Sequence, residues 1–256
     1  MDHEFSSISL QESKQRHRRM GPYIGLLIRK RSIDIQIEYM KRYNKELEAK
    51  FKKDLDDTDE YYSKEMSKVE NNSENVEMYA ELRFNDKEAI YEFIRNLRYS
   101  SLVNLFSFLE SSLNNLCLIL RKEMKIVISP EDLRHKGVTR SMIYLKKVCS
   151  VDFPSKGNDW QQIEKLNRVR NQIVHEQGVI NNKKERPGKT AFNIVNSTIG
   201  LSIKNDRQII VEYDYFPHII KNIKNLLDIV HEETVKALKK YQDKKHAENK
   251  RLLTNK

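Results

Sequence analysis

Large apolar residues recur at a spacing of four along the first third of the chain: Ile35, Tyr39, Tyr43, Leu47, Phe51 and Leu55. Positions four apart stay near one slowly drifting stripe of an α-helix. Between Ile24 and Val69 the chain has no Pro and no Gly other than Gly25. The stripe is one residue wide and its surroundings are charged. We therefore expect a helical arm over residues 21–80, packed along one edge against an antiparallel helix or a second subunit.

A second long helix carries the widest apolar surface. Asn85 and Asp86 can cap it after the Asn-rich break ENNSENVE, and it is expected to run to about Lys125. Apolar residues wrap more than half of its surface in its second half, which is typical of a central core helix. They are Ile90, Phe93, Ile94, Leu97, Leu105, Phe106, Leu109, Leu113, Leu116 and Leu120. Ser129-Pro130 should end it, before short helices over 130–136 and 139–149.

A third amphipathic helix is expected to begin at Trp160, with Asp159 as its N-cap. Gly178 is suited to end it, because glycine adopts the left-handed conformation common after helices. The expected core side consists of Ile163, Leu166, Val169, Ile173 and Val174. The polar stretch NNKKERPGK that follows is expected to be a loop.

Strand-like composition is confined to residues 192–213. FNIVN, IGLSI and QIIVEY are apolar and β-branched, and the turn-like KNDR separates the last two. A final apolar helix should begin near Tyr215. The pattern predicts a mainly α fold, a helical bundle with a long N-terminal helical arm and a small β-hairpin before the last helix. Residues 1–20 would be a basic polar tail, 85–245 the helical domain, and 246–256 a charged tail.

Composition narrows the class of protein. Only 7 Gly and 5 Pro occur among 256 residues, which disfavours all-β folds and Gly-rich nucleotide folds. Cys117 and Cys149 are too few for a disulfide framework or a four-cysteine zinc site, which fits a reducing compartment. The N-terminus has no signal-peptide pattern, and no apolar run approaches the ~20 residues of a membrane span. We expect a cytoplasmic protein without membrane contact.

The chain is basic. Lysine and arginine exceed aspartate and glutamate by 47 − 37 = 10. Such an excess favours polyanionic partners, of which nucleic acid is the commonest. The basic runs KQRHRR and KKYQDKK are expected to add nonspecific affinity for RNA. Solvated surface lysines without a partner are the alternative.

One segment, EKLNRVRNQIVHEQG at 164–178, carries residues suited to catalysis. On a helix, Asn171 and His175 lie four apart on one face, and Arg170 lies about 140° round the axis from His175. An imidazole transfers protons near neutral pH, and a guanidinium offers paired donors to a phosphate. Together they suffice to cleave a ribose-phosphate backbone without a metal or cofactor. The structural alternative is that Asn171 and His175 satisfy each other while Arg170 pairs with an acid.

The order Arg170, Asn171, three residues, His175 and a nearby Gly (RNQIVHEQG) resembles the signature of the HEPN family, the higher-eukaryote and prokaryote nucleotide-binding helical domains. FSFLESSLNNLC looks like the family's earlier core helix, which often carries a Glu at the place of Glu110. A hairpin followed by a terminal helix is similar to many bacterial members. The resemblance covers roughly residues 88–240.

The resemblance implies a dimeric all-α bundle and a metal-independent endoribonuclease, often a toxin or effector in antiviral, abortive-infection or toxin–antitoxin systems. It assigns His175 to proton transfer at the ribose 2′-OH, Arg170 to the scissile phosphate and Asn171 to orienting one or the other. Glu110 would pair with Arg170. The partners implied are RNA, a second copy of the chain, and an antitoxin or defence-system protein.

Gln177 departs from the toxin branch that pairs with nucleotidyltransferase antitoxins, which has Tyr at that place. The departure argues against that pairing. Two other functions stay open from the sequence. One is a non-catalytic HEPN module that binds protein or nucleotide. The other is a helical scaffold whose arm organises an assembly.

Overall fold

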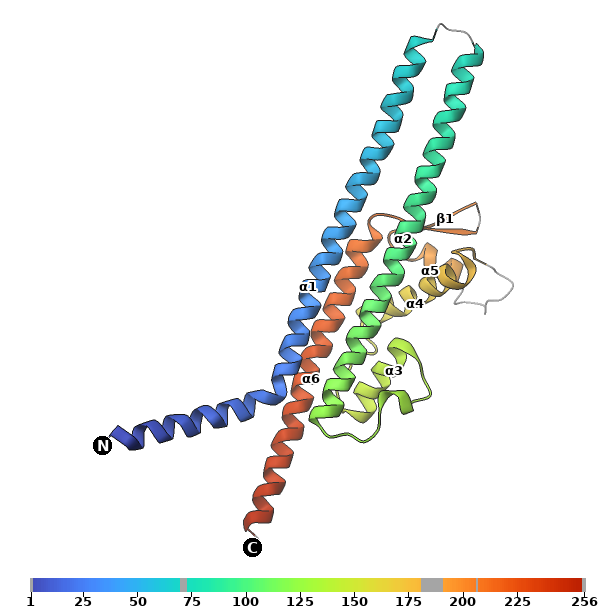
Figure 1. Cartoon of the computed structure of the whole chain (residues 1–256). Coiled ribbons are helices and arrows are strands. Elements are labelled where there is room, and N and C mark those ends of the chain that lie inside the picture. Colours follow the sequence, from blue (N-terminus) through green and yellow to red (C-terminus); the bar gives the residue numbers. More distant parts are fainter. Residues whose placement is uncertain (1, 70–72, 181–190, 206, 255–256) are drawn as a thin grey trace. The chain divides into compact units, whose positions relative to one another are not determined.

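The computed structural model describes the backbone of residues 2–69, 73–180, 191–205 and 207–254. The expected mainly α fold is confirmed, including the two-stranded hairpin before the last helix. In chain order the elements in Figure 1 are α1 (Asp2–Lys68), α2 (Ser73–Glu123), the 3-10 turn η1 (Pro130–Asp132), α3 (Gly137–Ile143), the π-type turn η2 (Tyr144–Val148), α4 (Asn158–Glu176), α5 (Ala191–Asn196), β1 (Leu201–Lys204), β2 (Gln208–Val211) and α6 (Tyr215–Thr254).

The chain divides into two compact units, and each is built from separated segments. Unit 1 contains residues 1–37, 107–161 and 222–256, and unit 2 contains residues 38–106 and 162–221. Four helices, α1, α2, α4 and α6, contribute to both units. Each unit therefore combines segments that are far apart in the sequence.

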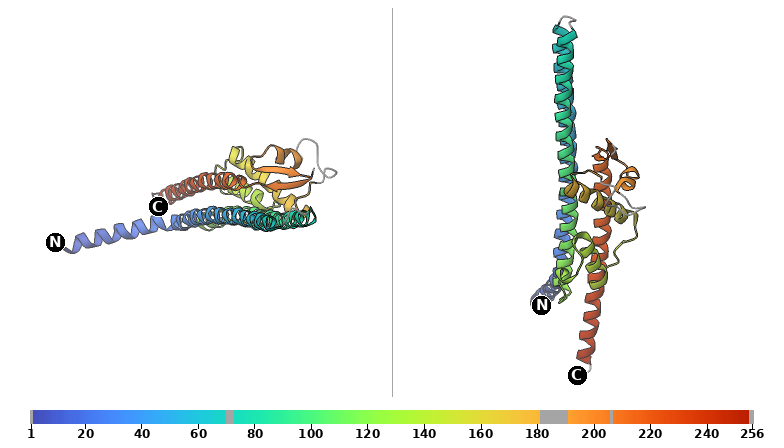
Figure 2. Two further views of the ribbon diagram at one scale, coloured as in Figure 1. Left: turned by 90° about the horizontal axis from the view of Figure 1, so that it is seen from above. Right: turned by 90° about the vertical axis from the view of Figure 1, so that its right-hand side faces the viewer.

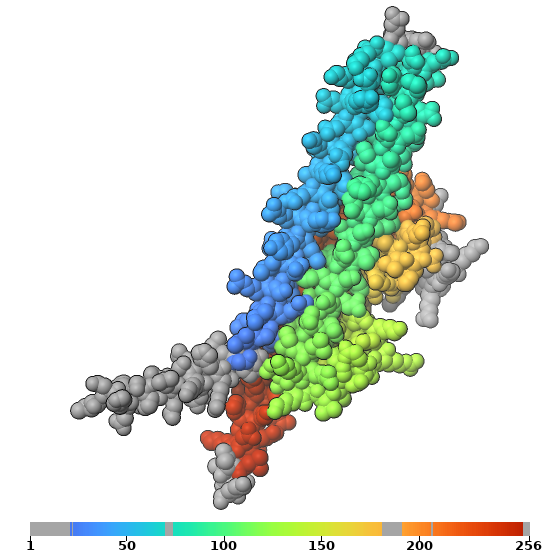
Figure 3. Space-filling view, viewed as in Figure 1, coloured from blue at the N-terminus to red at the C-terminus, as the bar shows by residue number. Residues whose placement is uncertain are grey.

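In unit 2, α1 and α2 form an antiparallel helical pair (Figure 1). The rings of Phe51 and Phe93 meet edge to face with centroids 6.1 Å apart. Closer to the end of α1, the Tyr62 hydroxyl donates to the Asp86 carboxylate at 2.5 Å. As the residue number rises along α1, the number of the contacting residue on α2 falls, which is the pattern of an antiparallel pair. Of the two packing partners expected for the arm, the antiparallel helix is the one present, and Figure 3 shows the two helices in contact along this length.

The buried side of α1 differs from the stripe predicted with a spacing of four. Tyr39 and Tyr43 are 62% and 52% exposed. The buried residues are Leu26, Ile33, Ile37, Phe51 and Tyr62. Their separations of 7, 4, 14 and 11 residues are close to multiples of the helical repeat of 3.6. A strict spacing of four turns by about 40° at each step, so three of the six predicted residues, Ile35, Tyr39 and Tyr43, lie exposed.

Three element boundaries also differ from the sequence prediction. The backbone is helical from Asp2, where a tail was expected over 1–20. α2 already begins at Ser73, so the arm is shorter than 21–80. α6 continues through the predicted charged tail to Thr254. Lys, Arg, Glu and Gln are good helix formers, and a polar segment rich in them need not be irregular.

The remaining elements of unit 2 lie on one side of the α1–α2 pair (Figure 2). β1 and β2 pair antiparallel, with Leu201 opposite Val211 and Lys204 opposite Gln208. FNIVN, which looked strand-like, is helical and forms most of α5. The predicted loop NNKKERPGK lies outside the described residues. The hairpin prediction is thus confirmed for its last two segments only.

Unit 1 is held by an apolar core and a charged network. Its fully buried residues include Leu109, Leu113, Leu116, Leu120, Tyr144, Leu145, Ile223, Leu226, Leu227 and Val230. Beside this core, Lys30 of α1 pairs with Asp34 at 2.7 Å and with Asp228 of α6 at 2.8 Å. Lys224 pairs with Asp228 at 2.7 Å and with Asp34 at 3.3 Å. Each charge therefore has two partners of opposite sign.

Among the described helices, α2 alone is long and apolar enough to cross a membrane, by length and composition only. Its most apolar window of 18 residues has a mean hydropathy of 1.3, and 44% of that window is buried within the protein. Core helices of water-soluble proteins meet the same criterion. The absence of a membrane span and a cytoplasmic location therefore both stay predictions.

Candidate active site

The helix α4 presents the predicted Arg–Asn–His residues, and its apolar side fixes which way they face. Ile163, Leu166, Val169 and Ile173 are buried, as predicted. Val174 is 45% exposed and does not belong to this core side. It lies about 80° round the helix from Leu166, at the margin of the buried stripe.

Arg170 lies about 40° from Leu166, between the directions of Leu166 and Ile163. It is half-buried, and its guanidinium lies over the Phe106 ring of α2, with Cζ 5.7 Å from the centroid. Its Nη1 donates to Oδ1 of Asn171 at 3.0 Å. Its Nε is buried and has no hydrogen-bond partner within the described part of the chain. The ring and the amide therefore hold the guanidinium in one place.

His175 points away from the core, about 180° from Leu166, and it is exposed. Among the described residues the structure gives its side chain no hydrogen bond or ion pair. Asn171 is bonded to Arg170, and the predicted alternative of an Asn171–His175 pair is not what the structure contains. The structure thus brings Arg170 and Asn171 together and leaves the imidazole open to solvent.

The end of α4, directly after His175, is tied to the hairpin. Gly178 has φ +77°, as its predicted role at the helix end requires, and its carbonyl accepts a hydrogen bond from the amide of Ile209 at 2.9 Å. The Gln208 side chain donates to the Tyr99 hydroxyl at 2.7 Å, and that hydroxyl donates to the Ile209 carbonyl. Sequence patterns carry no signal for Tyr99 or Gln208, because their contacts join segments far apart in the chain.

Glu110, the predicted supporting residue, lies on the part of α2 that belongs to unit 1. It is half-buried, and its carboxylate faces the start of α3: a Cβ added at Gly137 would lie 3.6 Å from Oε1. Arg170 belongs to unit 2. The pairing of Glu110 with Arg170 therefore stays a prediction.

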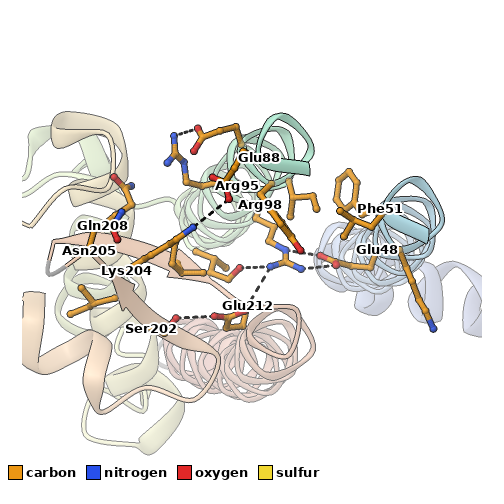
Figure 4. A pocket seen from close by; sticks show the side chains of 18 residues that line it. Glu48, Phe51, Glu88, Arg95, Arg98, Ser202, Lys204, Asn205, Gln208 and Glu212 are labelled. Carbon is orange, nitrogen blue, oxygen red and sulfur yellow. Dashed lines mark hydrogen bonds and ion pairs between the residues drawn. The ribbon is translucent and has the colours of Figure 1, made fainter. Parts of the chain in front are cut away.

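Unit 2 also contains a cavity of about 790 Å³ between α1, α2 and the hairpin (Figure 4). At its wall, Arg98 donates to both carboxylate oxygens of Glu48, at 2.8 and 2.7 Å, and to the carbonyl of Val211 at 2.9 Å. The lining carries four acidic residues, Glu48, Glu88, Glu92 and Glu212, and four basic ones, Lys52, Arg95, Arg98 and Lys204.

Most of these charges are already paired. Arg95 bonds Glu92, and Lys204 lies 4.0 Å from Glu88. A ligand of either charge would have to break ion pairs to bind, and we assign the cavity no ligand. The sequence did not predict it, because its three walls come from distant segments.

Comparison with protein-family models, with curated proteins and with solved structures finds no match. Within the described residues, no three His, Cys, Asp or Glu side chains gather as metal ligands. The assignment of a function depends on the side chains of α4 and on the distribution of charge.

Proposed function

We propose that this protein is a metal-independent endoribonuclease of HEPN type. One observation carries the proposal. On a single helix, Arg170 is held in place by Phe106 and Asn171, while His175 is open to solvent. A fixed guanidinium suits a phosphate, and an exposed imidazole suits proton transfer to a substrate that arrives from solution.

The reaction we assign is transesterification of the RNA backbone. His175 accepts the proton of a ribose 2′-OH, and the 2′-oxygen attacks the adjacent phosphorus. The bond from phosphorus to the 5′-oxygen breaks, and that oxygen takes up a proton. The products are a 2′,3′-cyclic phosphate and a 5′-hydroxyl. Arg170 binds the phosphate and stabilises the charge that develops on its oxygens, and Asn171 orients the guanidinium.

A homodimer supplies what one chain lacks. Arg170 and His175 lie about 140° apart around α4, so they diverge. The reaction uses one group to accept a proton and another to donate one. A second protomer, with its α4 helix facing the first, would add a second imidazole and a second guanidinium. The proposed active unit is therefore a pair of chains with a composite site.

The proposed role is that of a toxin or effector in antiviral defence or a toxin–antitoxin system, acting on RNA in the cytoplasm under the control of a partner protein. The exposed aromatic residues Tyr39 and Tyr43 on α1 favour a second candidate, a scaffold that binds other proteins through its helical pair. Protein binding by such a scaffold would not require the His175 imidazole.

Expression in a bacterial host tests the proposal. The wild-type chain should slow growth and fragment cellular RNA, whereas His175→Ala should do neither. His135→Ala is the matched control, because His135 is also exposed and lies outside the proposed site. If His175→Ala and wild type act alike on growth and RNA, the nuclease proposal is wrong.

A further inference from the structure

The positive charge of the chain is unequally divided between its two units. Unit 1 contains 25 Lys and Arg against 15 Asp and Glu, an excess of 25 − 15 = 10, whereas unit 2 contains 22 of each. The whole excess of the protein therefore lies in unit 1. The proposed Arg170–His175 site lies in unit 2, which carries no net charge.

Within unit 1, basic residues concentrate on the last part of α6. Residues 236–251 contain seven Lys and Arg, and their acidic residues are Asp243 and Glu248. The last buried side chain of α6 is Leu238, and every residue from 243 to 252 is exposed. Near the start of this stretch the Tyr23 hydroxyl donates to the side-chain oxygen of Gln242 at 2.8 Å. Beyond it, at the red end of the chain in Figure 3, the side chains of residues 243 to 252 are exposed, so burial in a core does not account for the lysines among them.

We propose that residues 236–251 of α6 form a phosphate-binding surface, here called the basic face, which holds the backbone of the RNA substrate. The identification of the polyanion as RNA rests on the proposed function. Lys236, Lys240 and Lys244 follow one edge of the helix, each about 6 Å further along the axis. Lys236 pairs with Glu233 at 2.6 Å, and Lys244 lies 4.0 Å from Glu248. Lys239 lies about 60° before Lys236 and Lys245 about 100° beyond Lys244, so the lysines cover about two thirds of the helix circumference. Contacts of this kind bind without regard to base sequence.

A membrane surface is the competing polyanion, and the basic face fits it less well. Helices that bind in the membrane interface bury an apolar side in the lipid. Between residues 239 and 252, Leu252 is the single exposed large apolar residue among the described side chains, and one leucine does not form an apolar side. An RNA backbone needs only the charges. The observations therefore favour nucleic acid over lipid.

The α1–α2 pair of unit 2 (residues 38–106) offers a comparison within the same chain. Residues 38–106 contain 12 Lys and Arg against 16 Asp and Glu, and exposed lysines there are interleaved with acids. Lys41, for example, pairs with Glu38 at 2.7 Å. Neutralising lysines on this pair changes the net charge of the protein as much as neutralising those of the basic face. It removes no concentrated positive surface.

Two variants with equal loss of charge test the inference, both in the His175→Ala background so that RNA stays intact. The first combines Lys239→Gln, Lys240→Gln, Lys244→Gln and Lys245→Gln. The control combines Lys45→Gln, Lys50→Gln, Lys53→Gln and Lys64→Gln, all exposed positions of the arm. Binding to a labelled 30-nucleotide single-stranded RNA is measured by fluorescence anisotropy across a salt series.

The basic-face variant should bind at least about tenfold more weakly at low salt. Its slope of log affinity against log salt should shrink by about 2 to 3, because about 0.7 is lost for each single-strand phosphate contact removed. The control should stay within about twofold of the parent. Equal affinity of both variants and the parent would overturn the inference. The inference would also be overturned if the basic-face variant lost binding to phosphatidylserine vesicles while its binding to RNA stayed unchanged.

The outcome is separable from that of the proposed function. If the basic face is needed for RNA binding but the chain with His175 intact cuts no RNA, the inference stands and the nuclease proposal fails. If that chain cuts RNA and the four basic-face substitutions, made with His175 intact, change neither binding nor cutting, the nuclease proposal stands and the inference fails.

Discussion

The guanidinium of Arg170 lies over the aromatic ring of Phe106, with Cζ 5.7 Å from the ring centroid. Phe106 is itself 3% exposed, so the ring is a fixed platform. Such cation–π contacts are worth about 0.5–2 kcal/mol. The contact orients a charged group at the edge of the core while one side of it stays accessible. An arginine that binds a phosphate needs both a fixed orientation and an accessible side.

Replacing Phe106 by Leu should lower RNA cleavage by about tenfold, because the guanidinium loses its platform and small misplacements of catalytic groups are costly. The same change should cost about 1 kcal/mol of unfolding free energy, since Leu fills most of the volume. Urea unfolding and a cleavage assay measure the two effects. Phe93→Leu, at a 54% exposed position of α2, is the control and should leave cleavage unchanged. Equal cleavage by Phe106→Leu and wild type would contradict the platform role.

Gly178→Ala should destabilise the protein strongly and disturb the end of α4. The backbone there has φ +77°, and a Cβ would overlap the Tyr99 hydroxyl and lie 2.9 Å from Nε2 of Gln208. We expect a loss of at least about 2 kcal/mol, measured by thermal and urea unfolding. Gly21→Ala in α1 is the matched control, since nothing lies within 4 Å of its added Cβ. It should be neutral or stabilise by up to about 1 kcal/mol. Equal melting temperatures for the two variants would refute this account of Gly178.

The charged network of unit 1 predicts a loss of stability in acid. Burial alone would raise the pKa of Asp34 and of Asp228, but hydrogen bonds from Lys30 and Lys224 outweigh it and hold both pKa values below 3.8. A carboxylate with a lowered pKa in the folded state contributes stability above its unfolded pKa, and this is lost as pH falls through the folded pKa. The urea midpoint should therefore fall as pH drops below about 4.

The double variant Asp34→Asn with Asp228→Asn isolates that effect. It should be less stable than wild type at pH 6, and its midpoint should change less between pH 5 and pH 3. If wild type and the double variant lose stability equally over this range, the network does not cause the acid sensitivity.

The composite site predicts a homodimer in solution. Sedimentation velocity should give a mass near twice 30.5 kDa at the concentrations where RNA is cleaved. Mixing His175→Ala chains with Arg170→Ala chains should restore part of the activity, since each dimer of mixed chains keeps one copy of each group. A stable monomer that cleaves RNA would contradict the composite site.

The sequence predicted the fold well where a helix buries a broad apolar side. The buried positions Leu109, Leu113, Leu116 and Leu120 follow from periodicity alone, and so does the core side of α4 up to Ile173. Polar composition suggested tails at the two ends of the sequence, whereas the described backbone is helical at residues 2–20 and 246–254. Apolar, β-branched FNIVN also misled, because such short runs suit a helix as well as a strand.

For the candidate site, spacing predicted that Arg170, Asn171 and His175 share a helix, and it did not predict their different surroundings. The ring under Arg170 comes from a residue 64 positions earlier, and the anchor of the α4 end comes from the hairpin. Contacts between distant segments depend on tertiary packing, which a local pattern does not encode. Likewise, Val174 was assigned to the core although it lies at the margin of the buried stripe.

The most direct measurement is cleavage of a defined RNA by purified protein in EDTA. Wild type should cut it and leave initial products with a 2′,3′-cyclic phosphate, while His175→Ala and Arg170→Ala should each lose at least about 100-fold in rate with melting temperatures near wild type. A 2′-deoxy substitution at the scissile nucleotide should abolish the cut, because it removes the attacking oxygen. The account is contradicted if wild type cuts no RNA, if it cuts only with added magnesium, or if both variants melt far below wild type.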